Sequence, residues 1–89
     1  MRPIDAIMAN VIINREIARQ YTNGQTEIEV TSDSIRAVIR ELDERFPGVG
    51  EVLRTDMAVA IDGEIYQNVL LEPVRPNSEV AFLPAIEGG

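Results

Sequence analysis

The apolar residues recur at helical spacing most clearly in one stretch of the chain. Between residues 34 and 46 they fall three and four positions apart, at Ile35, Val38, Ile39, Leu42 and Phe46, while charged residues fill the positions between them. Asp33 or Ser34 is suited to cap the start of this helix, and Pro47-Gly48 ends it. The pattern therefore predicts one main helix over about residues 34–46, packed by a single apolar stripe.

Short apolar or alternating runs on both sides of this helix predict β-strands. The first run is rich in β-branched residues, and the second alternates apolar residues with glutamates. Further runs follow the helix, the last of them close to the C-terminus. The predicted strands cover residues 10–15, 25–30, 57–61, 64–66 and 79–83.

Turn signals connect these runs. Asn23-Gly24 and Asp62-Gly63 each predict a tight turn, because such pairs tolerate a positive φ. A single helical turn fits part of residues 15–24 and residues 51–53, and a brief strand fits Val69–Leu71. The sequence holds no repeat and no linker that marks a second domain.

This order of elements predicts an α+β roll, in which one helix covers one face of a mixed sheet of four to five strands. The first and last strands are the most apolar, so we expect them side by side in the middle of the sheet. They then run parallel, because the helix lies in the connection between them. Residues 1–83 form the domain, with residues 1–9 as an ambiguous N-terminal extension. Residues 84–89 form a flexible tail that leaves from a central strand.

The composition excludes several classes of function. The sequence holds no histidine and no cysteine, which removes the usual general base, the commonest metal ligand and a nucleophilic thiol. A net charge of −7 speaks against nucleic-acid binding, which needs a basic surface. No apolar run approaches the roughly 20 residues of a membrane span, and Asp5 interrupts any signal-peptide pattern. We therefore expect a cytoplasmic protein with no metal, nucleic-acid or membrane partner.

Four segments resemble the ThiS/MoaD family of ubiquitin-like sulfur-carrier proteins, over roughly residues 25–89. The ending EVAFLPAIEGG is similar to the family's E-V-A-F-x-P-P-V-x-G-G pattern and is the most specific of the four. ELDERFPGV, Ile61-Asp62-Gly63 and LEPVRPNSEV resemble a helix end, a turn and the approach to the last strand. Ala85 and Glu87 depart from the pattern, which has a proline and a small residue there. The nearest subgroup is MoaD, the small subunit of molybdopterin synthase.

The resemblance implies the β-grasp fold and a carrier that is not itself an enzyme and binds no cofactor. A partner activating enzyme would use ATP to adenylate the carboxylate of Gly89, and a sulfur donor would convert the adenylate to a thiocarboxylate. Gly88 would give clearance in a narrow channel, because glycine lacks Cβ. The chain has no phosphate-binding loop, so catalysis belongs to its partners. In the molybdopterin branch, which the ending favours, a large synthase subunit accepts the tail.

Four residues near the tail are candidate docking contacts for these partners: Phe82, Leu83, Pro84 and Ile86. Strand alternation gives Phe82 an alternative place in the core, and Leu83 then points the other way and is exposed. Pro84 has the alternative role of ending the strand. Ile86 lies past the strand, where an exposed branched side chain favours binding.

Other functions fit parts of the same sequence. The thiazole-forming and cysteine-forming branches share the tail, and a ubiquitin-like modifier would join Gly89 to target lysines. A non-covalent interaction module would need no tail chemistry at all. An independent enzyme is the least favoured, because carboxylates such as Asp62, Glu64 and Glu72 show no nucleophile-base arrangement.

Overall fold

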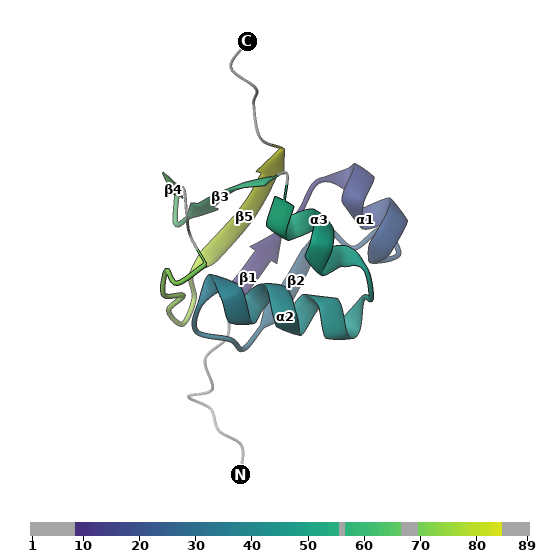
Figure 1. Cartoon of the computed structure of the whole chain (residues 1–89). Coiled ribbons are helices and arrows are strands. Elements are labelled where there is room, and N and C mark those ends of the chain that lie inside the picture. Colours follow the sequence, from purple (N-terminus) through teal and green to yellow (C-terminus); the bar gives the residue numbers. More distant parts are fainter. Residues whose placement is uncertain (1–8, 56, 67–69, 85–89) are drawn as a thin grey trace.

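The protein is a mixed five-stranded sheet with helices packed on one face (Figure 1). A computed structural model describes residues 9–55, 57–66 and 70–84. The strand order is β2-β1-β5-β3-β4, and only the central pair, β1 and β5, is parallel. The predicted arrangement of the first and last strands is therefore confirmed. The strands are β1 (Ala9–Ile12), β2 (Glu27–Val30), β3 (Met57–Ile61), β4 (Glu64–Tyr66) and β5 (Glu79–Pro84).

The predicted main helix is α2 (Ile35–Arg45), and its apolar stripe faces the sheet. Ser34 caps it, because its hydroxyl oxygen accepts a hydrogen bond from the amide of Ala37 at 3.2 Å. Of the two caps that the sequence offered, Asp33 and Ser34, the structure thus selects Ser34. Phe46 is half-buried at the C-cap position rather than within the last turn.

Two shorter helices accompany α2: α1 (Arg15–Tyr21) and α3 (Val49–Thr55). The first replaces the predicted end of the first strand, which stops at Ile12, and exceeds the single helical turn expected there. Asn14 explains the change, because its Oδ1 accepts a hydrogen bond from the amide of Ile17 at 2.8 Å and so begins a helix. Figure 1 shows α3 in front of the sheet, above α2.

The brief strand predicted at residues 69–71 is wrong for Leu70 and Leu71, which form a turn; Val69 lies outside the described residues. Their backbone pairs with the start of α2 instead of with a strand. The amide of Arg36 donates to the carbonyl of Leu70 at 2.8 Å, and that of Ile35 donates to the carbonyl of Glu72 at 3.0 Å. These bonds satisfy helix N–H groups that have no partner within the helix.

One apolar core joins all three helices to the inner face of the sheet. Val11, Val80 and Phe82 on the two central strands are among its most buried members. This is the α+β, β-grasp architecture predicted from the sequence. Within the described ranges, no helix has the length and apolar character needed to cross a bilayer.

Candidate functional site at the end of the central strand

Strand β5 carries the chain from the middle of the sheet to the base of the tail. Its side chains alternate, so that Val80 and Phe82 point into the core while Ala81 and Leu83 point outward. Phe82 is only 1% exposed, so the structure supports its alternative role in packing rather than in docking. Leu83 is 38% exposed and Pro84 is exposed at the end of the strand, where a partner can reach both.

The predicted strand ended at Leu83, but in the structure Pro84 is the last residue of β5 and pairs with Met57. The pairing with β1 ends at Ala81, so one side of β5 has no neighbour beyond that point. Proline is tolerated there because it has no N–H to offer to a further strand. The remaining predicted tail residues, Ile86, Gly88 and Gly89, lie outside the described residues.

The outer face of the sheet carries an apolar row beside the tail base. Strand registers align Ile12 with Ala81, Ala81 with Ala60, and Ala60 with Ile65, across β1, β5, β3 and β4. Leu83 pairs with Ala58 one step nearer to the tail. All helices of the described chain contribute to the core on the opposite face, so none of them covers this row.

The shape and charge of this open face suit a protein partner. The alanines at its centre leave space for larger side chains, and Ile65 is 66% exposed at its edge. Glu27 and Glu29, on β2, point to the same side as Ile12 and Asn10, their partners in the register. An apolar centre with an acidic margin is a common form of protein interface.

Of the residues on this face, only Leu83 was predicted from the sequence as a docking contact. The signal of the others lies in MAVAI, where Ala58 and Ala60 alternate with larger residues that point to the core. Small apolar residues on an outward face give no clear sign of a binding surface in the sequence. Only the register across β3 and β5 shows that they adjoin Leu83 and Ala81.

Asp62, Glu64 and Glu72 lie around a separate hollow of about 360 Å³. The carboxylate of Asp62 has a structural role there, because both of its oxygens accept hydrogen bonds. Its Oδ1 accepts one from the amide of Glu79 at 2.9 Å, and its Oδ2 accepts one from the hydroxyl of Ser78 at 3.1 Å. Glu64 accepts from the hydroxyl of Tyr66 at 3.1 Å, and this hydrogen bond raises the pKa of Tyr66 above 10.0. These contacts tie the β3–β4 turn to the start of β5. Among the described residues, no group of acids is arranged to hold a metal ion.

Solved structures share this architecture at low sequence identity. A chain of the BexX/CysO complex of Amycolatopsis orientalis matches with a TM-score of 0.77 and 22% identity, over 91% of this chain and 99% of that one. Small archaeal modifier protein 1 from Methanosarcina acetivorans matches with a TM-score of 0.75 and 15% identity, over 93% of this chain and 97% of that one. A chain of the complex of subunits 1 and 2 of molybdopterin-converting factor from Helicobacter pylori matches with a TM-score of 0.61 and 17% identity. The match covers 93% of this chain and 100% of that one.

A sequence comparison gives the family. A search of curated proteins finds no match, but the sequence model of the ThiS family matches residues 9–89. That match includes the whole sheet and continues through the tail to Gly89. The chain therefore belongs to the ThiS family, whose members are small ubiquitin-like carrier proteins.

Proposed function

We propose that this protein is a sulfur carrier whose working group is the C-terminal carboxylate of Gly89. The observation that carries the proposal is that the family match extends through the Gly88-Gly89 end. The fold agrees with it, because that tail follows a central strand beside an open apolar face. A carboxylate is a poor electrophile until one of its oxygens becomes part of a good leaving group. A partner activating enzyme would provide that leaving group by adenylation with ATP, which releases pyrophosphate. Attack by sulfide from a sulfur donor would then release AMP and leave a thiocarboxylate.

The open face of the sheet is the proposed docking surface for the activating enzyme. Leu83 and Pro84 adjoin both this face and the tail, so a partner that covers the face would receive the tail in its active site. Ile86 would make a further contact along the tail. Gly88 would let the last residues pass a narrow opening, because it has no side chain.

Sulfur delivery for molybdopterin is the favoured branch, because the ending is similar to that of MoaD. A large synthase subunit would then be the acceptor. The likeness to a chain of the BexX/CysO complex keeps a cysteine-forming branch as the alternative, and the thiazole branch shares the same chemistry. Purifying the chain with each candidate acceptor enzyme and following transfer of labelled sulfur would decide between the branches.

Mass spectrometry of the intact protein tests the proposal directly. After co-expression with its activating enzyme, the chain should gain the mass difference between sulfur and oxygen, located in the C-terminal fragment. A variant that lacks Gly88 and Gly89 should show no gain, although it retains the whole sheet. Absence of the thiocarboxylate with every activating enzyme of the source organism would refute the proposal.

Conjugation to proteins is a second candidate, favoured by the likeness to small archaeal modifier protein 1. The chain has no lysine of its own, so its targets would be other proteins. Trypsin is a poor reagent for this test, because no arginine or lysine follows Arg75. Glutamyl endopeptidase cleaves after Glu87 and would leave a Gly-Gly remnant on each target lysine. Such remnants would establish conjugation, and their absence from cells that accumulate the thiocarboxylate would exclude it.

A further inference from the structure

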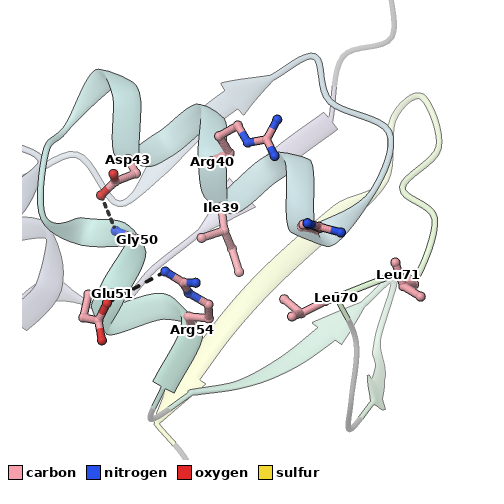
Figure 2. Close-up of a pocket in the computed structure, with 9 residues that line it drawn as sticks. Ile39, Arg40, Asp43, Gly50, Glu51, Arg54, Leu70 and Leu71 are labelled. Atoms are coloured by element: carbon pink, nitrogen blue, oxygen red, sulfur yellow. Dashed lines mark hydrogen bonds and ion pairs between the residues drawn. The ribbon is translucent and has the colours of Figure 1, made fainter.

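The helix layer carries a groove of about 610 Å³ between α2, α3 and the Leu70–Leu71 turn (Figure 2). It lies on the opposite side of the sheet from the open face described above. Three of the chain's eight cationic residues line it, although the net charge of the chain is −7. They are Arg36, Arg40 and Arg54.

Two of these arginines have no ion-pair partner among the described residues. Arg36 and Arg40 are four residues apart on α2 and so share one face, where like charges repel by a few tenths of a kcal/mol. Within the described ranges neither forms an ion pair. The neighbouring face of α2 differs, because Glu41 and Arg45 at the same spacing are paired at 3.1 Å. Within the described part of the chain, the groove therefore holds two neighbouring positive charges on α2 that no ion pair balances.

Two acids, Asp43 and Glu51, also line the groove, so its five charged residues carry a formal net charge of +1. Asp43 Oδ1 accepts hydrogen bonds from the amides of Gly48 at 3.0 Å and Gly50 at 2.9 Å, which commits that carboxylate to the start of α3. Glu51 lies 3.8 Å from Arg54, and both side chains are largely exposed. Such a loose surface pair holds its partner weakly. Among the described residues, Arg36 and Arg40 are thus the guanidinium groups left without an ion pair that an incoming carboxylate could bind.

The turn beside the arginines presents apolar side chains at a fixed position. Leu71 is 80% exposed and Leu70 is 39% exposed, yet the backbone of their turn is hydrogen-bonded to the start of α2. Figure 2 shows Leu70 pointing across the groove toward Ile39 and Arg54. Because the backbone of this turn is already held by hydrogen bonds, a partner that covers the leucines needs to order their side chains only.

We propose that this groove binds an acidic, apolar segment of a partner protein. Carboxylates of the segment would pair with the arginines, whose planar guanidinium groups suit such contacts, and its apolar side chains would cover the leucines. Arg54 precedes Met57 by three residues, and Met57 pairs with Pro84 at the tail base. Arg54 is therefore the lining arginine nearest in sequence to the tail base, whereas α2 lies toward the other end of the sheet (Figure 1). A partner held in the groove would leave the open face of the sheet accessible. The proposal does not depend on the chemistry of Gly89.

Selection from a random peptide display library on the full chain tests this docking site. We expect the enriched peptides to combine aspartate or glutamate with leucine or phenylalanine, and to shift amide resonances of Ile39, Arg40, Leu70 and Leu71. In calorimetric titrations with an enriched peptide, Arg36→Glu/Arg40→Glu should weaken binding at least about tenfold, because two attractive contacts become repulsive. Leu71→Ser should weaken it as well, and this exposed residue can be changed without disturbing the core.

Arg15→Glu/Arg75→Glu is the matched control, because it makes the same change in net charge at exposed positions outside the groove. It should weaken binding less than about twofold. Equal losses in the two double variants, or enriched peptides without acidic residues, would overturn the proposal. It would also fail if ATP shifted the groove resonances and peptides did not. Concentration-dependent dimerisation of the free chain, abolished by Arg36→Glu/Arg40→Glu, would assign the groove to a second copy instead.

Discussion

At the scale of single residues, Asp62 holds the start of the tail strand in place. It has a positive φ of 50°, and its carboxylate accepts hydrogen bonds from Glu79 and Ser78 at the beginning of β5. Asp62→Ala should lower the free energy of unfolding by about 2 kcal/mol, because it removes both acceptors and adds strain at this φ. Urea denaturation should show a lower midpoint with an unchanged slope.

Asp62→Asn is the control for this prediction. Asparagine tolerates a positive φ and keeps one carbonyl acceptor, so it should lose less than half as much stability as the alanine variant. Equal stability of Asp62→Ala and the original chain would show that the contacts to β5 contribute nothing.

Tyr66 provides a residue-scale prediction for alkaline pH. Its hydroxyl donates to Glu64, which raises the pKa of the phenol above 10.0. The folded state therefore holds this proton more tightly than the unfolded chain, so the stabilisation is complete below pH 10 and is lost as the pH rises through the folded pKa. In a Tyr21→Phe background, which leaves one tyrosine, absorbance titration should give a lower pKa after Glu64→Gln. An unchanged pKa would exclude Glu64 as the main cause.

At the scale of elements, two adjacent residues, Asp33 and Ser34, are candidates for the N-cap of α2, and mutations distinguish them. Ser34→Ala should lower the free energy of unfolding by about 1 kcal/mol, because it removes the side-chain acceptor for the amide of Ala37. Asp33→Ala should cost clearly less, since only the backbone carbonyl of Asp33 bonds to Val74 and alanine retains it. Thermal or urea unfolding of the two variants provides the comparison. A larger loss of stability in Asp33→Ala than in Ser34→Ala would contradict the role of Ser34 as the N-cap.

The elements that the sequence predicted best are those set by local patterns. The α2 stripe, the β3 and β4 runs and the Asp62-Gly63 turn all depend on neighbouring residues. Helix α1, of which the sequence predicted only a single turn, depends on Asn14, which fits both the end of a strand and the cap of a helix. The Leu70–Leu71 turn depends on hydrogen bonds to α2, more than thirty residues away, which no local pattern reveals.

At the scale of the whole molecule, the sheet separates two surfaces that the sequence alone does not distinguish. The parallel pairing of β1 and β5 was predictable, and it places the tail base at the centre of the sheet. Only the full register shows that Ala58, Ala60 and Ala81 form the outward surface next to Leu83. The arginine groove likewise needs α2, α3 and a distant turn together. The sequence alone thus pointed to the diglycine end, whose chemistry stays a prediction, whereas the two candidate partner surfaces required the fold.

A substitution that places a long cationic side chain on the open face should weaken docking without affecting folding. Ala60 points outward in the middle of the row, while its neighbours Val59 and Ile61 point into the core. Ala60→Arg should therefore change the free energy of unfolding by less than about 1 kcal/mol. If an activating enzyme docks on this face, its affinity should fall at least about tenfold, because a charged side chain fills the centre of the interface.

Gln25→Arg is the matched control, because it adds the same charge at an exposed loop position before β2. Titration calorimetry with the activating enzyme gives the affinity of each variant, and the rate of adenylate formation gives the consequence for the tail. Loss of affinity in Ala60→Arg alone, with both variants folded, is the expected result. Equal affinity in both variants would move the docking surface away from the open face. Because the arginine groove lies on the other side of the sheet, its peptide affinity should be unchanged in Ala60→Arg, which makes the two surfaces separable in one set of proteins.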